Sequence, residues 1–172
     1  VFEPACGHAA FLVSAMRLLT QLLPADKAVP SRRGPYLRSR LHGTDIDAFA
    51  LELARLSLTL ADIPNPDGWD LRVEDMFVGD RLKEQTQGNT ILLANPPSAK
   101  FEEWEIAKYS KLDTEIVIKN KAAEMLRLTL PELRPGSVFG VVLPQSILHG
   151  TFAADVRRFL IEKFELQEVS LF

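Results

Sequence analysis

Short apolar segments alternate along this chain with longer segments in which apolar residues recur at helical spacing. Two of the short segments, residues 91–94 and 138–143, are hydrophobic at nearly every position, which is typical of strands covered on both faces of a sheet. Further strands are predicted at residues 1–2, 41–46, 71–73 and 169–172, and helices at residues 9–23, 47–61, 114–130 and 152–164. The alternation predicts an α/β fold with a doubly wound, mostly parallel sheet and helices on both faces, in which residues 24–40 form a polar loop.

The composition fits one globular domain and excludes several other classes. The chain has 172 residues, of which 47% are hydrophobic and 25% charged, and its net charge of −3 gives no overall sign of a nucleic-acid binder. A single cysteine excludes an internal disulfide framework. No apolar run reaches the roughly 18 residues of a membrane span, so we expect a cytoplasmic protein with no membrane partner. Because the chain begins and ends inside apolar segments, we expect a fragment truncated at both ends.

The residues that directly follow each predicted strand are the most informative, because ligands bind at the carboxyl ends of parallel strands. Small residues at positions 4–7 follow the first strand and let a ligand approach the backbone. An ordinary tight turn, with Gly7 at positive φ, is the alternative. Asp45 ends the second strand, where a carboxylate is suited to two ribose hydroxyls. Asp47 is predicted to cap the helix that follows.

The third and fourth strands also end in residues whose chemistry suits contact with a base. Asp75 can accept a hydrogen bond from an adenine amino group, and Met76 can cover the ring; a solvated turn is the alternative. Asn95-Pro96-Pro97 ends the fourth strand and is the most specific feature of the chain. Two prolines fix the backbone there, and the Asn95 side chain adds a carbonyl oxygen. Two convergent acceptors hold an exocyclic amino group by both hydrogens and localise its lone pair, as methylation of a weakly nucleophilic nitrogen requires; a rigid turn without chemistry is the alternative.

Taken in order, these four strand ends resemble the class I methyltransferases that use S-adenosylmethionine. They resemble most closely the N6-adenine DNA methyltransferases of restriction-modification systems, over essentially the whole chain. The matching segments are residues 1–7 with Phe11 and Leu12, residues 45–47, residues 74–77, Asn95-Pro96-Pro97, residues 133–136 and residues 141–144. The resemblance implies a Rossmann-like catalytic domain that binds S-adenosylmethionine over residues 1–172.

The resemblance also implies a role for each matching residue. The cofactor-binding set is Glu3, Pro4, Ala5, Gly7, Asp45, Ile46, Asp75 and Met76, and the catalytic set is Asn95, Pro96 and Pro97. Within the first set, Asp45 would bind the ribose, Ile46 and Met76 would sandwich the cofactor adenine, and Asp75 would accept from its amino group. The target adenine would be flipped out of double-stranded DNA. The resemblance implies no metal. The partners that it implies are double-stranded DNA, bound largely by parts of the protein outside this chain, and a specificity or restriction subunit.

Two positions depart from the family pattern. The first motif usually reads Gly-Ser-Gly where this chain has Gly7-His8-Ala9, and alanine has less backbone freedom than glycine. The fourth motif usually ends in an aromatic residue that stacks on the flipped base, and this chain has Ser98 there. Phe101 or Trp104 is a candidate replacement for the missing ring.

Other functions and residues stay open on the sequence alone. A protein-glutamine methyltransferase faces the same chemical problem with an amide, and a non-catalytic cofactor- or DNA-binding module fits the two departures. The loop arginines either contact phosphates or are simply solvated; they are Arg32, Arg33, Arg38 and Arg40. His149 either lines the substrate cleft or is a loop residue. Phe49, on one apolar stripe with Leu53, Leu56 and Leu60, and Trp69 are predicted core residues.

Overall fold

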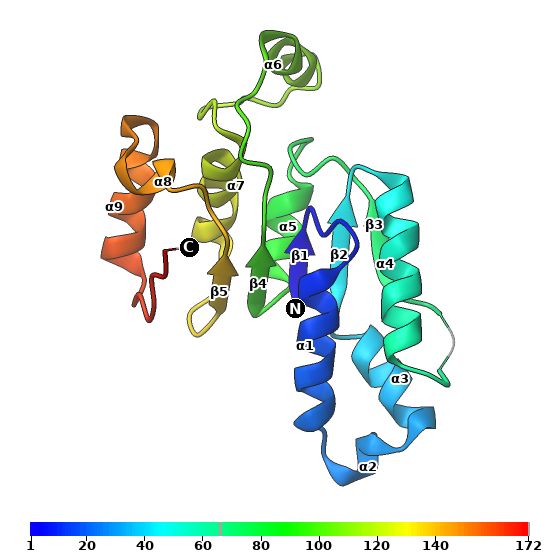
Figure 1. The fold of residues 1–172 in the computed structure, drawn as a ribbon. Helices are drawn as coiled ribbons and strands as arrows, with labels where there is room; N and C mark the ends of the chain where they lie inside the picture. The colour runs from blue at the N-terminus through cyan, green and yellow to red at the C-terminus, as the bar shows by residue number, and fades with distance from the viewer. Residues whose placement is uncertain (66, 172) are drawn as a thin grey trace.

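The computed structural model describes residues 1–65 and 67–171, and its centre is a five-stranded sheet (Figure 1). The strands are β1 (Phe2–Pro4), β2 (His42–Asp45), β3 (Asp70–Val73), β4 (Ile91–Ala94) and β5 (Val138–Val141). They lie in the order β3-β2-β1-β4-β5, and every neighbouring pair is parallel. The predicted parallel α/β architecture is therefore confirmed.

Helices cover both faces of this sheet. They are α1 (Ala10–Gln21), α2 (Ala25–Ala28), α3 (Pro30–Arg38), α4 (Ala48–Ala61), α5 (Arg81–Gln87), α6 (Glu103–Ser110), α7 (Lys121–Thr129), α8 (Ser146–His149) and α9 (Ala154–Lys163), with 3-10 turns at Leu130–Glu132 and Thr151–Ala153. In Figure 1, α1 and α4 lie in front of the sheet and α5 and α7 lie behind it. Among the helices described, none combines the length and the apolar character needed to cross a membrane.

Each face of the sheet has its own hydrophobic core. One core joins the inner sides of α1, α3 and α4 to β3, with Leu12, Leu37 and Leu58 fully buried. The other joins α5 and α7 to β1 and β4, with Phe2 and Leu92 at its centre. Burying two separate apolar layers fixes the sheet between them, which is the stable solution for a parallel sheet.

The strand order places a topological switch point between β1 and β4. From β1 the chain continues outward through β2 to β3, then returns to form β4 and β5 on the other side of β1. Phe2 pairs with His42 on one side and Leu92 on the other. The segments that follow β1 and β4 therefore leave neighbouring strands at the same edge, where ligands bind in such sheets.

The predicted orientation of helix α4 is wrong. Phe49 is 71% exposed, and Leu53, Leu56 and Leu60 of the same stripe are 40–59% exposed. The buried side of the helix instead carries Leu51, Ala54 and Leu58. Both sides of this helix are apolar, so periodicity alone does not say which one faces the sheet. Trp69 is buried, as predicted.

The predicted loop at residues 24–40 contains helices α2 and α3. Its Pro and Gly residues suggested a loop, but Pro30 stands in the first turn of α3, where a missing N–H costs nothing. Gly34 allows close packing, because a Cβ there would lie 2.8 Å from the Cγ atom of Asn65. Arg33 donates to the buried Asp62 carboxylate at 2.7 Å. Arg33 is therefore bound within the protein, an outcome that neither the phosphate contact nor the solvated loop predicted.

Three further expectations about the elements need correction. The helix predicted at 114–130 begins at Lys121, because Asn120 caps it by accepting from the Ala123 amide at 3.0 Å. Residues 169–171 are not in a strand, and residue 172 lies outside the described residues. Helices α5, α6 and α8 were not predicted, and His149 ends α8 as an exposed residue.

Candidate active site

The loop after β1 is fastened to the neighbouring strand β2. The Gly7 amide donates to Asp45 Oδ2 at 2.8 Å, and the Cys6 amide donates to the Thr44 carbonyl at 2.9 Å. The second carboxylate oxygen of Asp45 accepts from the Asp47 amide at 2.9 Å. Carboxylate oxygens accept more than one hydrogen bond, so Asp45 keeps capacity for ligand hydroxyls. The structure thus joins the first and second predicted motifs.

Positive φ angles recur in this loop, at Ala5 (55°), Gly7 (53°) and Ala9 (65°). A Cβ built on Gly7 would meet nothing within 4 Å, so open space lies directly over its backbone. A side chain there would fill the space that a ligand needs for close approach. Ala9 holds the left-handed conformation without being glycine, which is a strained arrangement at the start of α1.

Glu3 lies beneath the loop and is only 3% exposed. Its carboxylate accepts from the Leu12 amide at 3.2 Å, in the first turn of α1. Burial raises the pKa of the Glu3 carboxyl to about 8; the Leu12 hydrogen bond opposes this rise, and the Asp45 charge adds to it. Burial, together with the nearby Glu3 and Asp45 side chains, raises the pKa of the Cys6 thiol to about 12. Cys6 is therefore a buried, protonated thiol and not an activated nucleophile.

The residues after β3 place the Asp75 carboxylate against helix α6. Its two oxygens accept from the Tyr109 hydroxyl at 3.1 and 3.0 Å, and Oδ2 lies 3.2 Å from Lys108 Nζ. Met76 is half-buried beside it, while Ile46, the other predicted cover of the adenine, is 64% exposed after β2. Tyr109 and Lys108 carry no local signal of this contact, because they lie more than thirty positions downstream on an unpredicted helix.

The Asn-Pro-Pro segment leaves β4 with Asn95 exposed and Pro96 buried. Within the described residues, the Asn95 side chain makes no hydrogen bond to the protein. Ser98, also exposed, is held through its carbonyl oxygen, which accepts from Asn120 Nδ2 at 3.0 Å. Asn95 therefore presents its amide to solvent at the switch point, on a backbone fixed at both sides.

One of the two candidate replacements for the missing ring is wrong. Phe101 is only 5% exposed, and its ring packs edge-to-face against Phe77 at 4.8 Å and against Tyr109 at 5.7 Å between centroids. A ring committed to that aromatic cluster is not available to stack on a base. Trp104 is 68% exposed on α6, so it stays a candidate.

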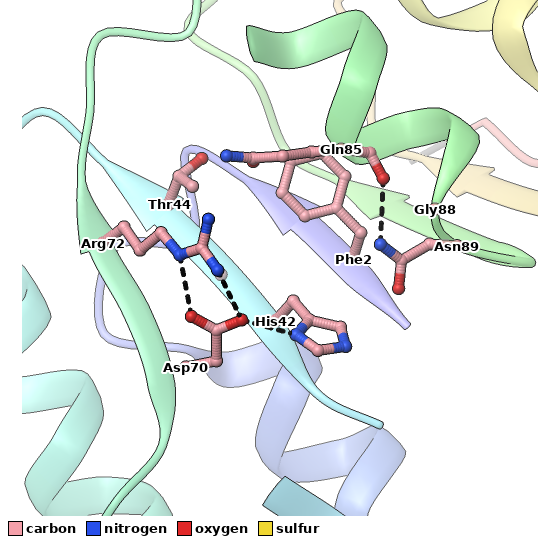
Figure 2. Close-up of a pocket in the computed structure, with 9 residues that line it drawn as sticks. Phe2, His42, Thr44, Asp70, Arg72, Gln85, Gly88 and Asn89 are labelled. Atoms are coloured by element: carbon pink, nitrogen blue, oxygen red, sulfur yellow. Dashed lines mark hydrogen bonds and ion pairs between the residues drawn. The ribbon is translucent and has the colours of Figure 1, made fainter. Parts of the chain in front are cut away.

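A separate hollow of about 240 Å³ lies over one face of β2 and β3, next to the end of α5 (Figure 2). There His42 and Asp70, the first residues of β2 and β3, pair in register, and His42 Nδ1 lies 2.8 Å from Asp70 Oδ2. Arg72 donates to both oxygens of the same carboxylate at 2.8 and 3.1 Å.

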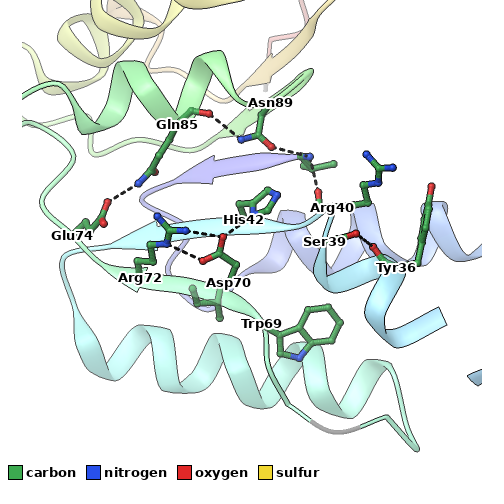
Figure 3. Close-up of polar contacts among 12 residues, drawn as sticks. Tyr36, Ser39, Arg40, His42, Trp69, Asp70, Arg72, Glu74, Gln85 and Asn89 are labelled. Atoms are coloured by element: carbon green, nitrogen blue, oxygen red, sulfur yellow. Dashed lines mark hydrogen bonds and ion pairs between the residues drawn. The ribbon is translucent and has the colours of Figure 1, made fainter. Parts of the chain in front are cut away.

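A second chain of polar contacts runs beside these three residues, from Glu74 through Gln85 to Asn89 (Figure 3). Burial alone would raise the pKa of the Asp70 carboxyl, but its hydrogen bonds with Arg72 and His42 outweigh burial and lower this pKa below its ordinary value. These polar side chains satisfy one another's hydrogen-bonding groups across neighbouring strands. We therefore interpret the residues that line the hollow as a structural network that stabilises the edge of the sheet.

A parallel sheet in the order β3-β2-β1-β4-β5, with a glycine turn and an Asn-Pro-Pro segment at its switch point, is typical of domains that bind a nucleotide-like ligand at the carboxyl ends of the strands. The chain belongs to the N-6 DNA methylase family, whose model matches residues 1–171. A curated relative, the type I restriction enzyme MjaIX methylase subunit of Methanocaldococcus jannaschii, is 29% identical over 122 residues. The aligned part is 70% of this chain and 19% of the relative, so the chain spans about a fifth of that protein.

Solved structures share the fold. A modification subunit of a putative type I restriction enzyme from Vibrio vulnificus superimposes with a TM-score of 0.65 at 20% identity, over 92% of this chain and 33% of that one. The type I restriction enzyme EcoKI M protein gives 0.66 at 24%, over 92% and 32%. The type ISP enzyme LlaBIII bound to DNA gives 0.66 at 18%, over 94% and 13%. At these identities the likeness supports the fold, and the chain matches about a third or less of each protein.

Proposed function

We propose that this chain is the cofactor-binding catalytic domain of a DNA methyltransferase that transfers a methyl group from S-adenosylmethionine to N6 of adenine. Its setting is a restriction-modification system. The observation that carries the proposal is the position of Asn95-Pro96-Pro97 at the end of β4, next to the β1 loop that Asp45 ties down.

The loop after β1 has the features that a ligand such as S-adenosylmethionine needs. Open space over Gly7 allows the ligand to contact the backbone, and Asp45 offers acceptor capacity for the ribose hydroxyls. Pro4 and Ala5 precede Gly7 at the end of β1 and the start of this loop, which the buried Glu3 supports through the Leu12 amide, and the Asp45 carboxylate offers a negative charge to a ligand that carries positive charge. When bound, the cofactor supplies an electrophilic methyl group on its sulfonium.

The protein's own contribution to the reaction is to hold the target amino group. The Asn95 side-chain oxygen and the Pro96 carbonyl accept hydrogen bonds from the two N6 hydrogens. This pulls the nitrogen away from planarity and directs its lone pair toward the neighbouring β1 loop. Pro97 keeps the backbone of that segment rigid, so that the acceptors are in place before the base arrives. Positioning and electrostatic stabilisation then account for the rate.

We further propose that sequence recognition and much of the DNA-binding surface belong to other parts of the assembly. The M. jannaschii relative is named as a subunit, and the chain matches a fifth of it. The LlaBIII structure is described as bound to DNA. A specificity subunit and double-stranded DNA are therefore the partners that we assign to this protein.

The test is methyl transfer by the intact protein that carries this chain. Genomic DNA free of N6-methyladenine offers every recognition sequence at once, and labelled S-adenosylmethionine reports transfer. Mass spectrometry of the nucleosides should detect N6-methyl-2′-deoxyadenosine. Asn95→Ala should lower the rate of product formation about 10²- to 10³-fold, whereas Ser14→Ala, at an exposed position on α1, should leave it unchanged.

Two results would refute the proposal. Labelling of a translation release factor, with none in DNA, would assign the chain to the glutamine methyltransferases. Failure of the folded chain to bind S-adenosylmethionine or S-adenosylhomocysteine in calorimetry would leave a non-catalytic module as the function.

A further inference from the structure

The segment between β4 and α7 forms a long loop beyond the carboxyl end of β4, and hydrogen bonds join its two ends. We call this loop, residues 99–121, the excursion. At its base, the Phe101 amide donates to the Lys119 carbonyl at 2.7 Å, and the Lys121 amide donates to the Ala99 carbonyl at 3.0 Å. Helix α6 lies within it, beyond the carboxyl end of β4 (Figure 1). The Asn-Pro-Pro segment therefore leads directly into this excursion.

The excursion reaches back to the loop after β3 at two places. Tyr109 and Lys108 of α6 contact the Asp75 carboxylate, and the Gly79 amide donates to Thr114 Oγ1 at 3.1 Å. The two segments that the proposed function assigns to the target base and to the cofactor adenine are thus joined by side-chain hydrogen bonds.

Tyr109 is held in one orientation. The residue is 4% exposed, and its ring packs edge-to-face against Phe77 and Phe101, with centroids 6.1 and 5.7 Å apart. Its hydroxyl lies almost equally far from both oxygens of Asp75. Burial and the Asp75 charge raise the pKa of the phenol above its ordinary value, so the hydroxyl remains a donor at neutral pH.

A carboxylate that selects an amino group must keep a fixed direction, because a freely rotating one loses entropy on binding. Asp75 is fixed by the Phe77 amide at 3.1 Å, by Tyr109 and by the Lys108 ammonium. Of these donors, Tyr109 is the one that is buried on the excursion and touches both oxygens. Because the single Tyr109 hydrogen is shared between the two oxygens, these three donors leave at least one lone pair of the carboxylate for a ligand.

We propose that Tyr109 is a positioning residue that orients the Asp75 carboxylate toward the 6-amino group of the cofactor's purine. The inference rests on the proposed function, since it assumes that Asp75 faces that purine. It makes the selection of adenine over a 6-oxo purine depend on the excursion that follows the Asn-Pro-Pro segment.

The test compares two ligands that differ only at purine position 6. S-adenosylhomocysteine has an amino group there and S-inosylhomocysteine has an oxo group. Calorimetry on the wild-type chain should give tighter binding of the adenosyl compound. Tyr109→Phe keeps the ring in its cluster and removes the hydroxyl, so it should weaken the adenosyl compound roughly five- to tenfold and leave the inosyl compound unchanged.

The chain contains two tyrosines, and Tyr36 supplies the matched control. Tyr36→Phe removes a hydroxyl from α3, in the other core, and should leave both affinities unchanged. Asp75→Asn should abolish the preference for the adenosyl compound. If Tyr109 acts through Asp75, the double variant should bind no more weakly than Asp75→Asn alone.

The outcomes separate this inference from the proposed function. Equal weakening of both ligands by Tyr109→Phe, or no weakening at all, overturns the positioning role while Asp75→Asn still reports a cofactor site. An Asp75→Asn variant that keeps the full preference overturns the adenine assignment of the proposed function, and the inference with it. Thermal unfolding of each variant verifies that the binding changes occur in folded protein.

Discussion

The loops that follow β1 and β4 leave neighbouring strands at one edge of the sheet, yet they are stabilised in opposite ways. The loop after β1 is bonded inward, from Gly7 to Asp45, and residues 6 and 9 of it are buried. In the loop after β4, residues 95, 97 and 98 are exposed, and the Asn120 side chain donates a hydrogen bond to the Ser98 carbonyl. The first loop is complete without a ligand, whereas the second presents acceptors to solvent.

Each of the two loops contains one of the two departures from the family pattern. Ala9 is buried within the inward-bonded loop, so its effect is on backbone strain and folding. Ser98 is exposed in the outward-facing loop, so its effect is on the target base. Changes at the first loop should therefore alter stability and cofactor affinity together, and changes at the second should alter binding of the target base and catalysis without altering stability or cofactor affinity.

The largest expected difference between the two loops comes from comparing the single variants Asp45→Ala and Asn95→Ala. Removing the Asp45 carboxylate leaves the Gly7 and Asp47 amides without partners, so we expect a lower Tm and about a hundredfold loss of cofactor affinity. Asn95→Ala should change neither, but should lower methyl transfer about 10²- to 10³-fold. Thermal unfolding, calorimetry and labelled transfer measure the three quantities. A fall in Tm for Asn95→Ala would contradict the contrast between the loops.

Glu3→Gln tests the buried carboxyl beneath the β1 loop. The pKa of Glu3 is about 8 in the folded chain against an ordinary 4.5, so the folded state binds this proton more tightly. The stability that Glu3 contributes is complete below pH 4.5 and is lost as the pH rises toward 8, by at most about 1.4 kcal/mol per pH unit. Relative to wild type, the variant should therefore become more stable as the pH rises.

Urea unfolding between pH 5 and 9 measures this difference. Glu52→Gln on α4 is the control, because the Glu52 side chain is 73% exposed and its removal should leave the pH dependence unchanged. Parallel stability curves for wild type and Glu3→Gln would show that the Glu3 carboxyl does not titrate in this range.

Ser98→Tyr tests the outward-facing loop by restoring a ring. Stacking on a flipped base contributes roughly 1–3 kcal/mol, so binding of the intact protein to its DNA site should tighten by that amount. Tm and cofactor affinity should stay constant, because Ser98 is exposed. Fluorescence of 2-aminopurine at the target position reports the flipped base, with Ser98→Ala as control. Unchanged fluorescence and affinity would mean that another group, such as Trp104, already stacks there.

The sequence predicted the sheet and the four strand ends because these depend on local pattern: apolar runs, a glycine turn and two prolines. It failed where long-range packing decides. Helix α4 has two apolar sides, and contact with the sheet selects Leu51 over Phe49. The fold of residues 24–40 depends on Arg33 meeting Asp62, and no local signal announces such a contact.

Ala9→Gly has the smallest expected effect and tests the strain in the inward-bonded loop. A left-handed alanine costs about 1–2 kcal/mol, and the buried methyl group that the variant loses contributes about 0.8 kcal/mol. With φ at 65° and the residue fully buried, we expect a net stabilisation of up to about 1 kcal/mol, measured by urea unfolding. Ala5→Gly, at φ 55° but less buried, loses less apolar contact and should gain more. Destabilisation by both variants would mean that packing of these methyl groups, rather than backbone strain, dominates the loop.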